Sequence, residues 1–345
     1  MKHFYFGVVL AMVLSLAGCN RSSQKQQQRL HLFAWSEYVP QEVIDGFTKQ
    51  TGIPVDYEVY DSNEKMLTKL LSSPGHYDLI QPSEYMVEHL IKRGLLEPID
   101  QSAVPNVANL LPEYRNPEYD PGMKYSVPYM AGTVGIVFNS DKIKDPIRGY
   151  QDVFQPKYAG RIIVLDDNRE IVSWAMNVKG IDINDATPAN LAKVKPLLAD
   201  WLKLVKIFNS DDPKPQLFSG DVDLGVVYCG DAAKLIEQDK KFKYVLPAEG
   251  AHRFIDNLCI PKDAPDKRAA EAFINYILKP EVSKLISDKF PYTNPNGSAR
   301  KLLTPQQLAN PASYPPDSVH LEIFHDIGKA NADISQLMTE LRNGR

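Results

Sequence analysis

Acidic and aromatic residues occur together where predicted strands end or begin. The segments are Trp35-Ser36-Glu37-Tyr38, Pro82-Ser83-Glu84-Tyr85, Asp166-Asp167-Asn168-Arg169-Glu170, Tyr228-Cys229-Gly230-Asp231, Phe254-Ile255-Asp256 and Pro291-Tyr292. Several carboxylates that face one cleft need cations, because a buried carboxylate is costly unless it is paired. Aromatic faces also attract cations, and methylene groups that lie between rings are removed from water. The combination predicts a binding site for an elongated organic cation with ammonium ends.

Other ligands and chemistries fit these segments less well. An amino acid ligand would need an arginine for its carboxylate, and Arg169, the only arginine in the segments, stands between acids. The seven histidines are scattered, and no run has the spacing of metal ligands, so we expect neither a metal nor a cofactor. Signatures of nucleophilic, zinc-dependent or nucleotide-binding enzymes are lacking. The remaining enzymatic alternative is an exported hydrolase with Asp166 and Asp167 beside Glu170 as paired acids.

Structural roles are the alternative for several of the same residues. Asp167 and Glu170 have the spacing of a helix-capping box. For Ser83 and Asp231 the alternative role is that of a helix N-cap. For Trp35 and Phe254 it is that of a core residue. Asp256 has no evident structural role, because it opens an otherwise apolar strand. The site is therefore predicted from the joint position of these residues and not from any one of them.

The elements that would position these side chains alternate between strand and helix. In the first block, apolar patterns predict strands at 30–35, 55–60 and 78–80 and helices at 41–51, 63–71 and 85–93. A segment rich in Pro and Asn at 105–121 interrupts the alternation. The second block has predicted strands at 161–165, 222–228 and 244–246 and helices at 169–179, 191–208 and 231–238. Further helices are predicted at 269–278, 281–286 and 326–341.

Two long apolar strands, at 125–139 and 254–260, can cross between the blocks, and Gly132 and Gly135 allow the first one to bend. Two α/β blocks joined by two crossings predict a two-lobed α/β protein with a cleft between the lobes. Ligands of such sheets bind outside the carboxyl ends of the strands. The segments with acids and rings lie at those ends.

The N-terminus has the pattern of an export signal. An uncharged run at 4–17 is shorter than the roughly 20 residues needed to span a bilayer. Leu16-Ala17-Gly18-Cys19 resembles the lipobox of bacterial lipoproteins, in which the cysteine is lipidated; a signal peptide with a chance cysteine is the alternative. We therefore expect a lipoprotein signal peptide at 1–18, a lipid anchor at Cys19 and a polar tether at 19–28.

Length and charge limit the class of protein. The 345 residues suffice for two domains, and the formal net charge of −4 would not attract nucleic acid. Cys229 and Cys259 either form a disulfide in an oxidising compartment or remain as small buried thiols, and the sequence leaves both options open.

Several short segments form a familiar series along the chain. They are Trp35-Ser36-Glu37-Tyr38-Val39-Pro40, Thr51-Gly52-Ile53, Ser62-Asn63-Glu64, Tyr77-Asp78-Leu79-Ile80, Tyr125-Ser126-Val127-Pro128-Tyr129, Phe208-Asn209-Ser210-Asp211 and Ala299-Arg300-Lys301-Leu302-Leu303. The series resembles the spermidine/putrescine-binding proteins of bacterial polyamine ABC transporters over nearly all of residues 29–345. The resemblance implies a type II-like periplasmic-binding-protein fold, with two lobes of mostly parallel sheet flanked by helices that close on the ligand.

The resemblance also implies partners and a location. We expect a monomeric binding protein without enzymatic activity that passes a polyamine to ABC permease subunits. It would be held by its lipid at the periplasmic face of a membrane, or at the outer cell surface of a Gram-positive cell. Lobe 1 is expected to comprise 29–132 and 253–300, and lobe 2 to comprise 133–252 and 301–345.

The predicted polyamine site draws on both lobes. It comprises Trp35, Ser36, Glu37, Tyr38, Ser83, Tyr85, Asp167, Glu170, Tyr228, Asp231, Phe254, Asp256 and Tyr292. By the resemblance, Asp256 holds an amine in the middle of the site and Glu170 holds another. The rings that would flank the methylenes are those of Trp35, Tyr228 and Phe254.

Departures from the family bear on the ligand. Spermidine-preferring relatives tend to have Trp at the positions of Tyr228 and Phe254 and an amide where this chain has Phe324. Asp231 resembles an acid of putrescine-preferring relatives. These differences favour putrescine, with spermidine next. An exported sensor that works without a transporter and a binding protein for another organic cation are the alternative functions.

Overall fold

The computed structural model describes residues 28–316 and 319–344. The predicted signal peptide at 1–18, the lipidation site Cys19 and all but the last residue of the tether at 19–28 lie outside the described residues.

The first lobe is built around a short parallel sheet. Strand β1 (Leu30–Trp35) lies between β2 (Val55–Tyr60) and β3 (Leu79–Ile80) and is parallel to both. The connecting helices are α1 (Gln41–Thr51), α2 (Asn63–Ser72) and α3 (Glu84–Lys92). Each has a buried apolar stripe at helical spacing, and α1 ends at Gly52, whose φ of 74° favours glycine. The alternation predicted from the sequence is therefore confirmed in this lobe.

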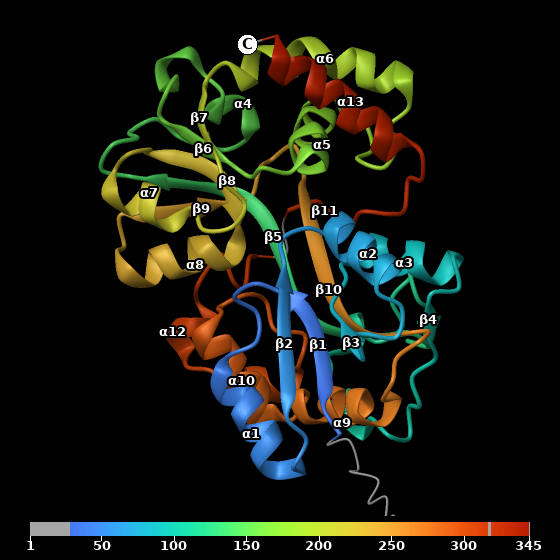
Figure 1. Ribbon diagram of the computed structural model, residues 1–345. Coiled ribbons are helices and arrows are strands. Elements are labelled where there is room, and N and C mark those ends of the chain that lie inside the picture. The colour runs from blue at the N-terminus through green and yellow to red at the C-terminus, as the bar shows by residue number, and fades with distance from the viewer. Residues whose placement is uncertain (1–27, 317–318, 345) are drawn as a thin grey trace, which may run out of the picture.

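The second lobe repeats the arrangement. Strand β6 (Ile162–Val164) is parallel to β7 (Val205–Phe208) and β8 (Leu224–Tyr228), and β9 (Phe242–Val245) lies antiparallel to the end of β5 (Ser126–Asn139). Its helices are α4 (Tyr150–Val153), α5 (Asn168–Val178), α6 (Pro188–Leu202), α7 (Lys214–Ser219), α8 (Cys229–Gln238) and α13 (Ala330–Asn343). Helix α13 packs on α5 and α6, at the top of the molecule in Figure 1.

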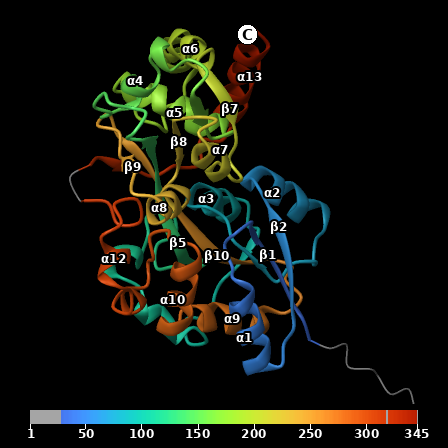
Figure 2. The same ribbon diagram turned by 90° about the vertical axis from the view of Figure 1, so that its left-hand side faces the viewer.

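Two long antiparallel strands join the lobes. Strand β5 pairs with β10 (Ala251–Pro261) along its first part and with β8 and β9 along its second part. Figures 1 and 2 show both strands running from one lobe into the other. At Gly132 of β5, a Cβ atom would lie 2.3 Å from the Phe254 ring of β10, so the glycine is needed for close packing at the crossing. The predicted two-lobed α/β fold is confirmed.

The remaining elements complete the two lobes and the edges of the sheet. They are β4 (Leu96–Glu97), β11 (Leu321–Glu322), α9 (Lys267–Ile277), α10 (Pro280–Lys289), α11 (Gly297–Arg300), α12 (Pro305–Leu308) and the 3₁₀ turns Pro105–Asn109, Pro112–Tyr114 and Pro156–Tyr158. None of the helices in the described part of the chain is long and apolar enough to cross a membrane.

Separate apolar cores accompany the two lobes. One cluster contains buried residues of β6, β8, α5, α6 and α13, and two others contain those of β1, β3, α1, α3 and α9. Cys229 belongs to the first cluster and Cys259 to one of the others, and both are buried free thiols. The two cysteines therefore do not pair. The separate cores support the proposed lobes, whose boundaries remain a prediction.

One predicted helix was wrong over part of its length. The sequence pattern extended a helix over 191–208, but α6 ends at Leu202 and the chain continues as β7. The segment Val205–Phe208 is rich in β-branched and aromatic residues and pairs with β6, so tertiary pairing outweighs the local apolar periodicity. The short helix α7 was not predicted either.

Candidate functional site

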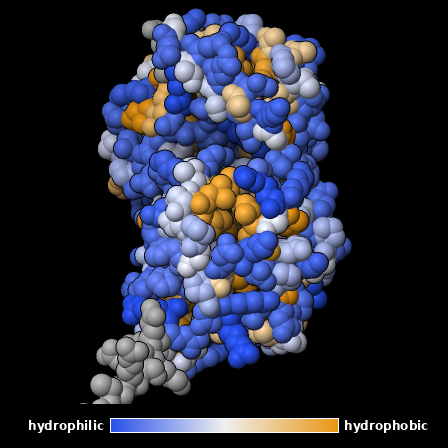
Figure 3. Space-filling model, turned by 45° about the vertical axis from the view of Figure 1, so that its right-hand side comes forward, coloured by the Kyte–Doolittle hydropathy of each residue, from blue (hydrophilic) through white to orange (hydrophobic). Residues whose placement is uncertain are grey.

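A crevice between the lobes collects every residue of the predicted site. The surface is indented between the upper and lower halves of the molecule (Figure 3), and the cavity there has a volume of about 150 Å³. The predicted residues that line it are Trp35, Ser36, Glu37, Tyr38, Ser83, Tyr85, Asp167, Glu170, Tyr228, Asp231, Phe254, Asp256 and Tyr292. Their binding of a ligand remains a prediction, but their convergence is a property of the fold.

The crevice has further lining residues that the predicted site did not include. They are Asp61, Ser62, Asn63, Glu64, Asp166, Arg169, Ser210, Asp211, His252 and Phe324. Asp61 and its neighbours follow β2, so the strand-end rule applied to that strand would have found them. Ser210 and Asp211 follow β7, the strand that the sequence analysis took for helix. His252 shares one face of β10 with Phe254 and Asp256 by the period of two.

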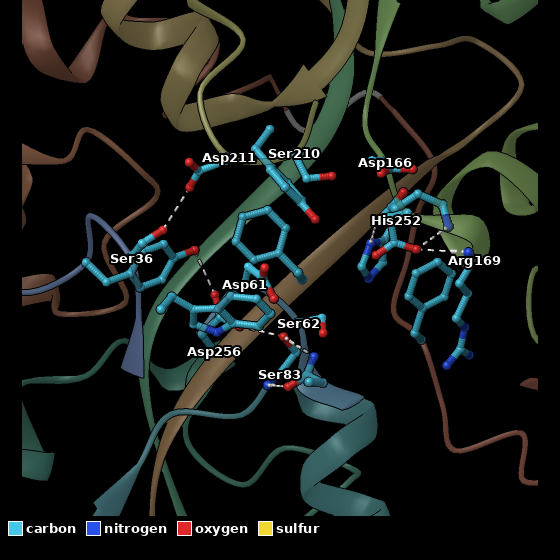
Figure 4. Close-up of a pocket in the computed structure, with 18 of the residues that line it drawn as sticks. Ser36, Asp61, Ser62, Ser83, Asp166, Arg169, Ser210, Asp211, His252 and Asp256 are labelled. Atoms are coloured by element: carbon cyan, nitrogen blue, oxygen red, sulfur yellow. Dashed lines mark hydrogen bonds and ion pairs between the residues drawn. The ribbon is translucent and has the colours of Figure 1, made fainter. Parts of the chain in front are cut away.

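The loop after β1 forms one wall and touches the opposite lobe. Glu37 has a φ of 54°, a left-handed conformation that is uncommon for a residue other than glycine. The hydroxyl of Ser36 donates to Asp211 Oδ1 at 3.2 Å, which links the two lobes at the left of Figure 4. Trp35 packs on Tyr60 with ring centroids 4.7 Å apart. Backbone strain of this kind is common at ligand sites.

Asp256 lies at the bottom of the crevice and is only 2% exposed. Ser83 Oγ donates to its Oδ1 at 2.6 Å and Tyr38 Oη donates to its Oδ2 at 2.9 Å (Figure 4). No basic side chain of the described residues forms an ion pair with it. Burial, reinforced by the charge of Glu84 and partly offset by the Ser83 hydrogen bond, raises the pKa of Asp256 to about 7. A cation that enters the crevice would therefore meet a carboxyl group that gains strongly from a partner.

A row of aromatic rings runs from the first lobe to the second. Tyr38 and Tyr292 have ring centroids 5.3 Å apart, and Tyr292 and Phe254 are 6.0 Å apart. The row continues from Phe254 to Tyr228 at 5.7 Å, edge to face. All four rings line the crevice. Such a wall suits a chain of methylene groups next to a charged end.

The start of α5 contributes two acids with different partners. Asp167 is the N-cap, and its carboxylate accepts from the backbone N–H groups of Arg169 at 2.8 Å and Glu170 at 3.1 Å, so Asp167 caps the helix but the predicted capping box with Glu170 does not form. The Glu170 side chain turns instead to His252. Burial and the charge of Glu170 raise the pKa of Asp167 to about 6. Asp167 lines the crevice, and no basic side chain of the described residues forms an ion pair with it.

A histidine cation neutralises Glu170 inside the protein. His252 Nδ1 lies 2.6 Å from Glu170 Oε1, and His252 Nε2 lies 3.2 Å from Glu84 Oε1. The Phe324 ring stacks on the imidazole with centroids 3.7 Å apart. Burial opposes the charge on the ring, but the two carboxylates outweigh it and raise the pKa of His252 to about 9. The expected amine partner of Glu170 thus has a competitor within the chain.

The cation of Arg169 also lies beside this end of the crevice. Its guanidinium is 4.1 Å from the Phe324 ring centroid and 4.8 Å from that of Tyr85, and it donates to the carbonyl oxygen of His325 at 2.6 Å. Figure 4 shows Arg169 and His252 on the same side, away from Asp256. Both cations at this end of the crevice therefore lie beside acids, and Phe324, which stands where spermidine-preferring relatives were expected to have an amide, packs on both of them.

Asp231 and Ser83 have roles that differ from those of helix caps. Asp231 stands within the first turn of α8, whose N-cap position is Tyr228, so the alternative of Asp231 as N-cap is wrong. Its carboxylate accepts from Lys214 Nζ at 2.5 Å. Ser83 does hold the N-cap position of α3, but its hydroxyl bonds Asp256 and not the helix. Within the described residues, no group of three or more His, Cys, Asp or Glu side chains could hold a metal.

Comparisons with known proteins agree with this geometry. The family model of the bacterial extracellular solute-binding proteins matches residues 42–315. A spermidine/putrescine-binding periplasmic protein of Salmonella typhimurium is 36% identical over 351 residues, which cover 100% of both chains. The solved structure of the spermidine/putrescine ABC transporter substrate-binding protein PotD from Streptococcus pneumoniae has a TM-score of 0.79 at 32% identity and covers 91% of this chain and 98% of its own.

A lipoprotein is also among the similar structures. The TpPotD lipoprotein of Treponema pallidum has a TM-score of 0.81 at 28% identity, over 91% of this chain and 99% of that one. Matches of this length, together with the crevice between two α/β lobes, show that the chain belongs to the bacterial extracellular solute-binding proteins and, among them, to the spermidine/putrescine-binding periplasmic proteins.

Proposed function

We propose that this protein captures a polyamine, putrescine in preference to spermidine, and delivers it to an ABC importer. The observation that carries the proposal is Asp256, a buried carboxylate without an ionic partner among the described residues, at the bottom of a crevice walled by aromatic rings. A ligand ammonium can replace the missing cation while its methylenes contact the rings. Similar proteins that are named as spermidine/putrescine-binding proteins support the same class of ligand.

The preference for a diamine follows from the acids that remain open. Among the acids of the predicted site, Glu170 is paired with His252, and Asp231 and Glu37 are paired with Lys214, whereas Asp167 and Asp256 have no basic partner within 4.0 Å among the described residues. Glu64 and Asp211 also line the crevice without such a partner, but they are exposed. The two open acids that are not exposed match a ligand with two ammonium groups. The cavity of about 150 Å³ is the size that holds a benzene molecule, with about six non-hydrogen atoms. A four-carbon diamine has the same number of atoms, and spermidine needs room for a further aminopropyl arm.

Closure of the two lobes would hold the ligand. The lobe 1 ranges 29–132 and 253–300 and the lobe 2 ranges 133–252 and 301–345 divide the crevice residues between two bodies. The bond from Ser36 to Asp211 and the ion pair of Lys214 with Glu37, at 3.6 Å, join these bodies across the mouth. Contacts of this kind can form when the lobes close and break when they open.

The proposal also includes the location and the partners of the protein. Cys19 would carry a lipid that holds the protein at the periplasmic face of a membrane, or at the outer surface of a Gram-positive cell. The similarity to a lipoprotein supports this location. The protein would act as a monomer, bind ABC permease subunits and release its ligand unchanged. A hydrolase with paired acids has less support, because Asp166 forms an ion pair with Arg342 at 2.7 Å and Asp167 caps α5.

A thermal-shift screen tests the ligand class. The full chain is heated with putrescine, spermidine, amino acids or sugars, each at millimolar concentration. A ligand at 100 times its dissociation constant stabilises the folded state by about 2.7 kcal/mol. We expect the two polyamines to raise the melting temperature and the other compounds to leave it unchanged. Asp256→Asn is the matched control, because it keeps the shape of the crevice and should lose the shift. No shift with either polyamine would refute the proposed function.

A further inference from the structure

Asn63 is a buried amide in the wall of the crevice. It is the first residue of α2 and is only 4% exposed. Its Nδ2 donates to Ser83 Oγ at 3.2 Å and to Tyr85 Oη at 3.0 Å, and its Oδ1 accepts from the backbone N–H of Ser83 at 3.3 Å. The last of these bonds fixes the orientation of the amide, because an amide nitrogen does not accept from an N–H group. The amide N–H groups therefore point at two hydroxyl oxygens.

Each of these hydroxyl groups has a single proton, and the bond from Asn63 determines where that proton points. An oxygen that accepts from the amide turns its own O–H toward a different acceptor. For Ser83 this acceptor is Asp256 Oδ1 at 2.6 Å (Figure 4), and for Tyr85 it is Glu64 Oε1 at 3.3 Å. Both acids line the crevice. One buried amide thus directs two hydroxyl donors toward carboxylates that face the ligand.

We propose that Asn63 is a positioning residue for ligand binding, which favours the ionised form of Asp256 by holding the Ser83 hydroxyl as a donor to it. This inference rests on the proposed function, in which Asp256 pairs with a ligand amine. Hydrogen bonds in a chain polarise one another, so the bond from Ser83 to the carboxylate is stronger with the amide behind it. Donors to a carboxylate favour its charged form. An ionised Asp256 can meet an ammonium group without first losing a proton.

Other groups around Asp256 also influence its charge. Tyr38 Oη donates to Oδ2 at 2.9 Å, the charge of Glu84 raises the pKa of Asp256, and the cation of His252 lowers it. Burial raises the pKa of several neighbouring tyrosines well above 10, so these rings stay neutral; they are Tyr60, Tyr129 and Tyr292. A substitution of Asn63 leaves all these groups in place and isolates the contribution of the Ser83 hydroxyl.

The test removes the amide and follows the protonation of Asp256. Asn63→Leu keeps a side chain of similar size without the donors, and Asn63→Ala is a second variant that avoids any overpacking. In both variants we expect the titration midpoint of the Asp256 carboxyl, followed by carbon-13 NMR in the ligand-free protein, to move to higher pH. If Asp256, with its pKa of about 7, becomes a tenfold weaker acid, the putrescine affinity falls about tenfold at pH 5.5 and about twofold at pH 8, as measured by calorimetry.

A merely structural role for Asn63 would have a different consequence. Loss of its support for the loop at Ser83 would weaken binding by the same factor at both pH values and leave the midpoint of Asp256 unchanged. The double variant Ser83→Ala with Asn63→Leu gives a further distinction. Compared with Ser83→Ala alone, it should show the same midpoint, because the hydroxyl through which Asn63 acts is already gone.

Asn190 offers the matched control. It is a buried amide in the first turn of α6, 8% exposed, and it does not line the crevice. Asn190→Leu should leave the midpoint of Asp256 and the pH dependence of binding unchanged. An unchanged midpoint in Asn63→Leu and Asn63→Ala would overturn the assignment of Asn63 while the proposed function stands. Failure of the original protein to bind either polyamine would overturn the proposed function itself, and the NMR titration needs no ligand, so the two failures are distinguishable.

Discussion

The affinity for putrescine should fall steeply when the pH is lowered from 8 to 5, because Asp256 then takes up a proton. Its pKa is raised to about 7 in the absence of ligand, mainly by burial. A bound ammonium favours the ionised carboxylate, so below pH 7 binding must release a proton and becomes weaker as the pH falls. The ligand amines, with pKa values near that of lysine at about 10.4, stay charged throughout.

The magnitude follows from the two open acids. A group with a pKa of about 7 that must be ionised in the complex lowers affinity about 100-fold between pH 8 and pH 5. Asp167, with a pKa of about 6, adds about tenfold if it holds the second amine. Two charged groups face Asp256, and they act in opposite directions: Glu84 raises its pKa and His252 lowers it. His252 stays cationic over this range, since its pKa is about 9.

Calorimetric titrations at half-unit steps of pH provide the assay, and the proton release is measured in buffers of different ionisation enthalpy. Asp256→Asn is the control: it should bind more weakly at pH 8, by about 2–5 kcal/mol for a lost charge partner. It should also lose the part of the pH dependence centred near 7. An affinity for putrescine that is constant between pH 6 and 8 would refute the assignment of Asp256 as an amine partner.

Two further changes test other parts of the site. His252→Gln removes the cation between Glu170 and Glu84. The pKa of His252 is raised from 6.5 to about 9 in the folded protein. The protonated ring therefore stabilises the folded state fully below pH 6.5, and this stabilisation is lost as the pH rises through 9. The variant should therefore be about 3 kcal/mol less stable than the original protein at pH 6 and nearly equal at pH 10, as measured by urea denaturation at each pH. Gly132→Ala would place a methyl group 2.3 Å from the Phe254 ring and should lower the melting temperature and the putrescine affinity together. A normal affinity in that variant would show that the Phe254 ring does not contact the ligand.

Local patterns in the sequence were sufficient for the fold and for the walls of the site. Alternation of apolar residues located both parallel sheets, and the rule that ligands meet the carboxyl ends of strands located Trp35, Ser83 and Asp167. The rule failed where the strand itself was missed. Since 205–208 was taken as helix, Ser210 and Asp211 were not recognised as strand-end residues.

The internal cations could not be predicted from local patterns, because their partners are distant in sequence. His252 meets Glu170 across 82 positions, because β10 passes beside helix α5 in the folded chain. Lys214 stands in a loop and short helix without apolar periodicity. Only the three-dimensional structure shows that each of these basic residues points toward an acid of the crevice and not toward solvent.

The charge of a ligand therefore cannot be inferred from the number of acids in such a crevice. Glu170 and Asp231 belong to the wall, yet His252 and Lys214 already balance them. The acids that select the ligand are those without a basic partner in the protein. For these acids the cost of desolvation is not offset by an internal cation, so only they gain a new partner when the ligand enters. Replacement of a single basic residue at position 214 or 252 would release one of the balanced acids. The same scaffold could then select a ligand with one more positive charge without any change in its acidic residues.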